Sequence, residues 1–347
     1  MEGILSTQQE LAGMQHISTL KEWLDSPKRI AITTHQRPDG DAIGSSLGLY
    51  HFLKDSGHKV KIIAPTDYGE NLKWLPGKED IIIGPDDPDM ANWNFESADL
   101  IFCLDFNALS RINEFEDTVR YAEGKKIMVD HHLEPEGFSD LDFWDHTASS
   151  TAEMVFRMIT ALGETDKIST DAAEAIYMGV MTDTGSFRFT TTTPAVHRMI
   201  AVLLEKGANS NKIHDRIHGN STENRLRFFG YCLSNCLFIL PELKTAYIKV
   251  DKSVFKEFYI KPGETEGLVN YALGIKNVNL GILLTSQDDI VKFSFRSREE
   301  VSASELAKQF GGGGHFYAAG ARLIGNLEEA EEKLIALLEE NKEMLIK

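Results

Sequence analysis

The chain has 347 residues, of which 42% are apolar, and its formal net charge is −17. A chain of this length usually forms two domains, and the apolar fraction is enough for a substantial core. The negative charge argues against a general binder of duplex DNA, which normally displays a broad basic surface. It does not exclude an enzyme that acts on nucleotides, because metal ions bound by carboxylates reverse the sign of a site that counts as acidic in the sequence.

The compartment expected for this sequence is the cytoplasm. No apolar run approaches the roughly eighteen residues needed to cross a bilayer, so we expect no membrane partner. The start, MEGILSTQQELAGM, lacks the basic residues and the small-residue cleavage site of a secretory signal. Three cysteines are too few for a disulfide framework. Cys232 and Cys236 share one face of an expected helix, where we interpret them as buried thiols rather than a metal pair.

The first half of the chain alternates strand and helix patterns. Short apolar segments predict strands at residues 28–34, 58–64, 80–83, 99–105 and 125–130. Helical spacing of apolar residues predicts helices at 42–55, 149–162 and 170–182. This β-α-β succession is typical of a mostly parallel sheet covered by helices.

The second half begins with an almost entirely helical pattern from Pro194 to about Phe238. After it come predicted strands at 245–250, 280–285 and 290–295, a helix at 302–310, four glycines at 311–314, and a charged amphipathic helix from Leu327 to the end. The sequence therefore predicts an α/β fold with two domains. A catalytic domain of residues 1–190, built on a mostly parallel sheet flanked by helices, is joined by a helical linker of residues 191–238 to a smaller α/β domain of residues 239–347.

The segment HQRPDGDAIGSS, residues 35–46, carries the most chemical information. It follows a buried strand and opens a helix, so it lies at the carboxyl end of the sheet, where open α/β folds place their ligands. His35, Asp39 and Asp41 bring one imidazole and two carboxylates together, a set that suits a borderline-hard divalent cation such as Mn²⁺. The alternative is an Asp-rich turn in which Asp41 is only the N-cap of the following helix.

Further acidic residues stand where a predicted element ends. Asp105 closes a strand, the sequence Asp130-His131-His132 closes the next strong strand, and Asp183 ends a helix in the segment MTDTGSF. Asp105 or Asp183 alone could be a turn residue, but two histidines after a buried strand are costly unless they bind something.

The carboxylates of these segments suggest more than one metal ion. Asp39, Asp41, Asp105 and Asp183 carry one negative charge each, and two divalent cations would neutralise the four. Without cations, four carboxylates in one site would repel each other and raise their own pKa values. We therefore expect a site with two metal ions.

Together these motifs resemble the DHH phosphoesterases, a superfamily named for the sequence found here at residues 130–132. The four N-terminal motifs occur in order: HQRPDGDAIGSS, the strand ending on Asp105, VDHH and MTDTGSF. The C-terminal half resembles the DHH-associated domain through Phe295-Arg296-Ser297 and GGGGHFYAAG at residues 311–320. Within the superfamily, the length and the domain pair are most similar to the nano-RNase A type. These are bifunctional oligoribonucleases and phosphatases of 3′-phosphoadenosine 5′-phosphate (pAp).

The resemblance implies a role for each metal-site residue. One metal would be held by His35, Asp39 and Asp105, and the other by Asp41, Asp105, His131 and Asp183, so that Asp105 bridges both. The pair would activate water for in-line attack on phosphorus. His132 would contact the scissile phosphate or protonate the leaving oxygen, and Asp130 would orient a metal ligand. The implied cofactor is two Mn²⁺ ions, with Mg²⁺ or Co²⁺ as alternatives.

The resemblance also implies a second group of residues that grip the substrate. The glycine run could be a flexible linker, but its position before a histidine suits close backbone approach to an anion. Arg296 and, more weakly, Arg111 are either solvated residues or phosphate clamps. The expected substrate-binding residues are Arg111, Arg296, Ser297, Gly313, Gly314 and His315.

The function implied is that of a manganese-dependent phosphodiesterase and phosphatase. It would hydrolyse RNA of about two to five nucleotides to mononucleotides, or pAp to AMP and phosphate, with the substrate in a cleft between the domains. Hydrolysis of linear dinucleotides such as pApA or pGpG stays open. An inorganic pyrophosphatase lacks the glycine-histidine motif, and a RecJ-like exonuclease would be far longer. A non-catalytic nucleotide-binding protein is the alternative from a different class.

Overall fold

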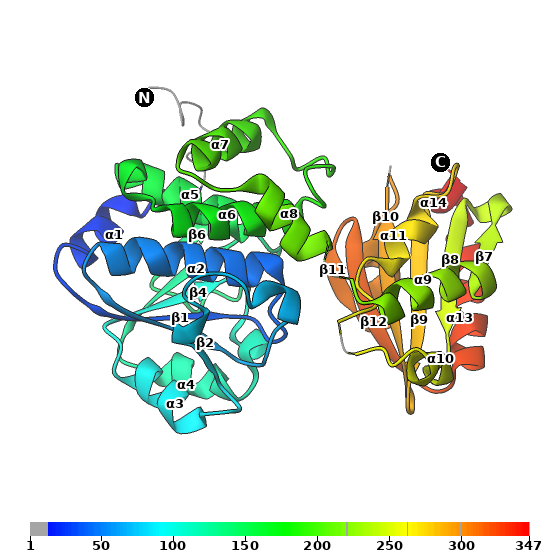
Figure 1. Cartoon of the computed structure of the whole chain (residues 1–347). Helices are drawn as coiled ribbons and strands as arrows, with labels where there is room; N and C mark the ends of the chain where they lie inside the picture. The colour runs from blue at the N-terminus through cyan, green and yellow to red at the C-terminus, as the bar shows by residue number, and fades with distance from the viewer. Residues whose placement is uncertain (1–12, 220, 262, 299, 347) are drawn as a thin grey trace. The chain divides into compact units, whose positions relative to one another are not determined.

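The structure is a computed structural model that describes residues 13–219, 221–261, 263–298 and 300–346. It consists of two compact units, which divide at residues 220 and 221, and each has its own six-stranded sheet (Figure 1). The predicted α/β class is confirmed. Within the described residues, no helix combines the length and the apolar character that crossing a membrane requires.

The first unit is built on a parallel sheet with the strand order β3-β2-β1-β4-β5-β6. Its strands are β1 (Arg29–Thr34), β2 (Lys59–Ala64), β3 (Ile81–Ile83), β4 (Leu100–Leu104), β5 (Lys125–Asp130) and β6 (Leu141–Trp144). Strands β1 to β5 confirm the predicted strands. The edge strand β6 was not predicted because its four residues alternate between buried and half-buried and include an acidic residue.

Helices cover both faces of this sheet, which explains why its central strands β1 and β4 are almost entirely buried. They are α1 (Ile17–Trp23), α2 (Gly40–Asp55), α3 (Pro88–Glu96), α4 (Glu116–Tyr121), α5 (Thr151–Ala161), α6 (Thr170–Asp183), α7 (Pro194–Glu205) and α8 (Ser210–His218). Short 3₁₀ helices lie at η1 (Glu70–Leu72), η2 (Lys78–Asp80), η3 (Leu109–Phe115) and η4 (Thr165–Lys167). Figure 1 shows α2, α5 and α6 on one side of the sheet and α3 and α4 on the other. Each side has its own hydrophobic core between the helices and the sheet.

Helices α2 and α6 pack unusually closely because α2 has glycine at every fourth position that faces α6. A Cβ atom on Gly44 would lie 2.7 Å from the carbonyl oxygen of Ala175 and 2.7 Å from the backbone of Gly179. One on Gly48 would lie 2.5 Å from Ile176, and one on Gly40 would overlap the side chain of Thr182. The backbones therefore approach as closely as small residues permit, which brings the start of α2 beside the end of α6.

The second unit has a mixed sheet with the order β11-β12-β10-β9-β8-β7, in which only β8 and β9 pair in parallel. Its strands are β7 (Leu237–Leu240), β8 (Thr245–Val250), β9 (Leu280–Gln287), β10 (Ile290–Ser297), β11 (Gly313–His315) and β12 (Ala318–Ile324). Its helices are α9 (Glu223–Asn235), α10 (Lys252–Glu257), α11 (Leu268–Leu273), α12 (Ala303–Lys308), α13 (Leu327–Glu340) and α14 (Lys342–Ile346), with the 3₁₀ helix η5 (Pro241–Leu243). Helices α12, α13 and α14 pack on one face, and α9, α10 and α11 on part of the other.

Several details of the second half differ from the sequence prediction. The helix expected to reach Phe238 ends at Asn235, and the apolar run LFIL forms β7. The spacing of residues in such a short apolar run does not distinguish a strand from the end of a helix. Within the segment predicted as a linker, α7 and α8 belong to the first unit and α9 to the second. The last two glycines of the run at 311–314 start strand β11. All three cysteines are buried and unbridged, and for Cys232 and Cys236 the buried thiols were predicted.

Candidate metal centre

The polar residues singled out in the first unit meet at the carboxyl ends of β1, β4 and β5. Strands β1 and β4 are neighbours, but β1 continues into α2 on one face, whereas β4 leads through η3 into α4 on the other. This reversal of the connections is the position at which open α/β sheets place their ligands. His35 and Asp39 follow β1, and Asp105 follows β4.

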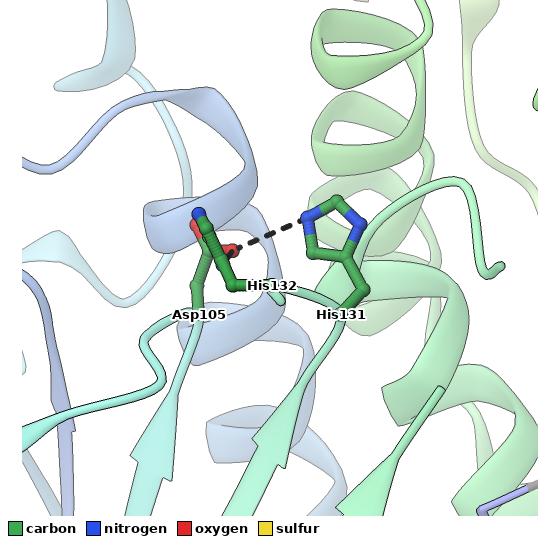
Figure 2. A group of neighbouring side chains, drawn as sticks. All are labelled: Asp105, His131 and His132. Carbon is green, nitrogen blue, oxygen red and sulfur yellow. Dashed lines mark ion pairs between the residues drawn. The ribbon is translucent and has the colours of Figure 1, made fainter. Parts of the chain in front are cut away.

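Asp105 occupies the centre of the cluster. Its side chain is buried, its Oδ2 lies 3.5 Å from Nε2 of His35, and its Oδ1 lies 3.7 Å from Nε2 of His131. The hydroxyl of Thr151 donates a hydrogen bond to Oδ1 at 3.0 Å. Figure 2 shows Asp105 and His131 pointing toward one another from the ends of neighbouring strands, with His132 beside them. The carboxylate thus lies between two imidazole rings.

The backbone of Asp105 has φ = +66°, in the left-handed region. This conformation costs an ordinary residue roughly 1–2 kcal/mol, and aspartate is among the few that tolerate it. Its amide still donates to the carbonyl oxygen of Val129 at 3.1 Å. Asp105 thus combines a left-handed backbone at the end of β4 with a carboxylate that lies between His35 and His131.

Asp41 is held at the N-terminus of α5. Its two carboxylate oxygens accept hydrogen bonds from the backbone amides of Thr151 at 2.6 Å and Ala152 at 2.9 Å. These amides are among the first of the helix, which have no partner within it and favour a negative group. Burial and then the charge of Asp183 raise the pKa of Asp41 to about 8. The N-cap of α2 is Asp39, whose Oδ1 accepts from two backbone amides, so Asp41 does not have the capping role considered from the sequence.

Both candidate imidazole ligands are oriented by a backbone carbonyl. Nδ1 of His35 lies 2.8 Å from the carbonyl oxygen of Gln36, and Nδ1 of His131 lies 3.2 Å from that of Ala148. A carbonyl only accepts, so Nδ1 carries the hydrogen and Nε2 presents a lone pair toward the carboxylates. Burial lowers the pKa of His35, and the charge of Arg111 acts in the same direction, which favours the neutral ring. This is the orientation that metal-binding histidines normally have.

His131 connects the remaining carboxylates to the cluster. Its Nε2 lies 3.5 Å from Oδ2 of Asp183 and 3.9 Å from Oδ2 of Asp41. Asp183 ends α6 and Asp41 is in the first turn of α2, so the close packing of these two helices sets their separation. A Cβ atom on Gly179, in α6, would lie 3.1 Å from Oδ1 of Asp41.

Among the described residues, three groups of side chains each have ligand atoms within 4.8 Å of one another, and the third shares one residue with each of the other two. They are His35–Asp39–Asp105, Asp41–His131–Asp183 and Asp105–His131–His132. All six residues predicted as metal ligands are therefore brought together, and the third group adds His132, which was not predicted as a ligand. Burial and the neighbouring carboxylates also raise the pKa of Asp105. Divalent cations would offset this repulsion, so the donor set fits metal ions.

One contact within the Asp-His-His motif shows which histidine Asp130 orients. Oδ1 of Asp130 accepts a hydrogen bond at 2.7 Å from Nδ1 of His132, which is two residues further along the chain. Asp130 therefore orients His132, a member of the third ligand group. Burial alone would raise the pKa of Asp130, but the hydrogen bond and charge of His132 hold this pKa below its ordinary value.

A buried ion network that the sequence analysis missed supports the cluster. Nη1 of Arg157 lies 2.8 Å from Oδ2 of Asp145, and Nη2 of Arg157 also contacts Glu153. Glu153 accepts hydrogen bonds from the amide and the hydroxyl of Ser149, and Asp145 accepts from those of Thr147.

This network fixes the segment of residues 145–152, which carries several groups that hold the cluster. The carbonyl of Ala148 contacts His131, the hydroxyl of Thr151 contacts Asp105, and the amides of Thr151 and Ala152 contact Asp41. Arg157 therefore positions the site without touching it. The only sequence signal was an arginine and a glutamate four residues apart on an otherwise apolar helix.

The other predicted substrate residues fall in different places. Arg111 lies in η3, and its carbonyl accepts from the amide of Gln36 at 2.8 Å, beside His35. In the second unit, Ala318 of β12 pairs with Arg296 of β10 on one side and with His315 of β11 on the other. Gly313 and Gly314 precede His315 on β11, and the side chain of His315 lies outside the described part of the structure. Ser297 is buried and its amide donates to the carbonyl of Tyr317 at 3.0 Å.

A doubly covered parallel sheet with a carboxylate and imidazole cluster at its carboxyl edge defines a class of α/β proteins equipped to hold metal ions. Comparison with known families gives the same result. Residues 29–180 match the N-terminal domain of the DHH family, and residues 244–343 match the DHHA1 domain.

Known relatives match nearly the whole chain. It is 34% identical over 313 residues to the bifunctional oligoribonuclease and PAP phosphatase NrnA of Thermus thermophilus, a match that covers 90% of this chain and 89% of that protein. The NrnA protein of Bacillus subtilis is 29% identical over 310 residues, with 89% and 93% covered. A crystal structure of an exopolyphosphatase-related protein from Bacteroides fragilis is 39% identical, with a TM-score of 0.93, and covers 96% of this chain and 98% of its own. The chain belongs to the DHH family, and the resemblance seen in its motifs is confirmed.

Proposed function

We propose that this protein is a metal-dependent phosphoesterase that hydrolyses short RNA oligonucleotides to mononucleotides and pAp to AMP and phosphate. The observation that carries the proposal is the set of three ligand groups, which are joined through Asp105 and His131. The substrate class is supported by the relatives that match most of the chain, which are named for oligoribonuclease and PAP phosphatase activities.

The proposed ligand sets are those that the family resemblance implies, and the three ligand groups support them. One ion is held by His35, Asp39 and Asp105, and the other by Asp41, Asp105, His131 and Asp183. When bound, two such ions activate water and neutralise charge on the phosphoryl oxygens. We propose Mn²⁺ as the native ion, because imidazole ligands favour it over Mg²⁺, which prefers oxygen ligands and keeps its waters.

The remaining side chains act on the substrate and on the proton. Asp130 fixes Nδ1 of His132, so that Nε2 is the atom that gives a proton to the leaving oxygen. The hydroxyl of Thr151 keeps Asp105 in one orientation. Arg111, beside His35, supplies positive charge for a phosphate. In the second unit, we propose Arg296, Ser297, Gly313, Gly314 and His315 as phosphate-binding residues, with His315 assigned from the sequence motif alone.

The test is a comparison of initial rates with Mn²⁺ on four substrates: pAp, a 5′-phosphorylated dinucleotide, a 24-nucleotide RNA and inorganic pyrophosphate. We expect hydrolysis of the first two and much slower hydrolysis of the others, with no turnover in chelator. Fastest turnover of pyrophosphate, or equal rates on the 24-nucleotide RNA and the dinucleotide, would contradict the proposal. Binding of nucleotides without turnover of any substrate would indicate a non-catalytic nucleotide-binding protein.

The second candidate is a hydrolase of linear dinucleotides such as pApA or pGpG. Adding these to the same series separates the two, because this candidate requires rates on pApA or pGpG well above the rate on pAp. Replacing Mn²⁺ by Mg²⁺ tests the metal assignment, and we expect slower turnover at saturating Mg²⁺. Equal or faster turnover would contradict the role of His35 and His131 as ligands.

A further inference from the structure

The second unit contains a cavity of about 480 Å³ that lies over strands β9, β10 and β12. It is separate from the metal-ligand cluster, whose residues are all in the first unit. Cavities of this size hold small-molecule ligands in proteins. The residues that line it indicate which kind of ligand fits.

Three polar side chains form a row across the floor of the cavity. Lys292 of β10 pairs directly with Thr285 of β9 on one side and with Arg322 of β12 on the other, and both pairings are antiparallel. Directly opposite residues in antiparallel strands project from the same face of the sheet. Phe293, the next residue of β10, projects from the other face into the core and stacks on Phe310 with ring centroids 4.5 Å apart. Lys292 and Arg322 are thus directed away from the core, on the side of the cavity.

The charge of the lining is opposite to that of the chain. The protein has 53 acidic and 36 basic residues, yet none of the described residues that line the cavity is acidic. Two cations directly opposite each other destabilise a sheet. An anion bound beside both would offset this repulsion, so the lining fits an anionic ligand.

Backbone and hydroxyl groups complete the lining. Gly311 and Gly312 form part of it, and a Cβ atom on Gly312 would overlap the carbonyl oxygen of Gly320, so only glycine lets the run lie this close to β12. Ser294 and Thr285 add hydroxyls. Phe255, from α10, adds an aromatic ring, and such rings are favourable partners for nucleobases.

We propose that this cavity binds one nucleoside monophosphate unit, with Lys292 and Arg322 at the phosphate and Phe255 near the base. The site is distinct from Arg296, which lies four residues further along β10, roughly 13 Å away at the usual rise of a strand. The choice of ligand rests on the proposed function. The unit belongs either to an RNA substrate longer than a dinucleotide or to a free mononucleotide product.

The test is a calorimetric titration of AMP into the full-length protein in chelator at low salt, with Asp105→Asn present to disable the metal centre. We expect the double substitution Lys292→Gln with Arg322→Gln to weaken AMP binding at least tenfold. The matched control, Lys276→Gln with Lys333→Gln, removes two cations of the same unit that do not line the cavity and should change binding less than twofold. Unchanged AMP affinity in the Lys292/Arg322 variant overturns the proposal, as does loss of binding with Arg296→Gln alone.

Kinetics with the metal-loaded enzyme distinguish the two sources of the nucleotide. If the cavity holds part of the substrate, the Lys292/Arg322 variant should raise KM for a five-nucleotide RNA at least tenfold more than KM for pAp. If it holds the product, the inhibition constant of AMP should rise tenfold instead, with the two KM values moving together. Failure to hydrolyse any of these substrates would refute the proposed function, while the AMP titration would still decide whether the cavity binds the ligand.

Discussion

The two units handle charge in opposite ways. In the first, Asp41 and Asp105 are each only 2% exposed and are held by hydrogen bonds from Thr151 and Ala152. In the second, Lys292 is half-buried and Arg322 is exposed, and both project from the face of the sheet opposite α12 and α13. Buried groups depend on the packing around them, whereas more exposed groups depend mainly on their strand. The geometry of the first site and the stability of its unit should therefore change together, and those of the second should not.

The largest effect is expected from Asp105→Asn. It should abolish turnover and reduce the bound metal from two ions to nearly none, because a bridging carboxylate serves both. Asparagine is the appropriate replacement since it tolerates the left-handed backbone and keeps an acceptor for Thr151. Metal analysis and circular dichroism check occupancy and fold, with the exposed Asp86→Asn as control. A variant that still binds two ions and turns over normally would remove Asp105 from the site.

Next in size is the effect of Arg157→Met, which leaves the buried carboxylates of Glu153 and Asp145 without their cation. Breaking a buried ion pair in this way costs about 3–5 kcal/mol. Urea unfolding measures the loss, and metal titration of the folded fraction should show weaker binding. The control is Arg120→Met, whose half-exposed pairs with Glu116 and Glu136 should matter little. If both substitutions cost the same, the network around Arg157 does not have the role assigned to it.

A smaller effect is expected from Gly44→Ala. The added Cβ would lie 2.7 Å from backbone atoms of α6, and overpacking of this kind typically costs about 1–3 kcal/mol. Separation of α2 from α6 should also weaken metal binding, because it moves Asp41 away from Asp183. Gly230→Ala, in α9 of the second unit with open space around it, should instead stabilise by about 0.5–1 kcal/mol. Equal effects of the two substitutions would show that the close helix approach is not required.

The smallest effect is a pH dependence of the metal-free protein. The pKa of Asp41 is raised from 3.8 to about 8 in the folded state, so the fold favours its protonated form. Below pH 3.8 the raised pKa of Asp41 costs no stability, because the carboxyl is protonated in both states. Stability is lost as the pH rises from 3.8 to about 8, where only the unfolded state is ionised. In chelator, Tm should therefore be lower at pH 8.5 than at pH 6, and Asp41→Asn or saturating Mn²⁺ should reduce the difference. A Tm in chelator that rises over this range would contradict the shift.

The sequence predicted the parts of the fold and site that depend on local pattern. Apolar segments ending on polar residues located β1, β4 and β5, and the same ends located His35, Asp105 and His131. What it did not show were contacts between distant residues. Asp41 accepts from amides 110 and 111 residues further along the chain, and the glycines of α2 are explained only by α6. The sequence also did not show which of the two adjacent histidines Asp130 contacts, because that choice depends on backbone direction after β5.

The placement of the ligand set has a consequence for how the chain reaches its native state. The six candidate ligands extend from His35 to Asp183 and come from the ends of three strands and two helices. Each proposed ligand set joins distant parts of the chain, so an ion bound by either set binds the native state and not the unfolded one. By mass action, such an ion stabilises the first unit by an amount that grows with its free concentration. Cellular metal supply would then set the lifetime of this enzyme as well as its rate.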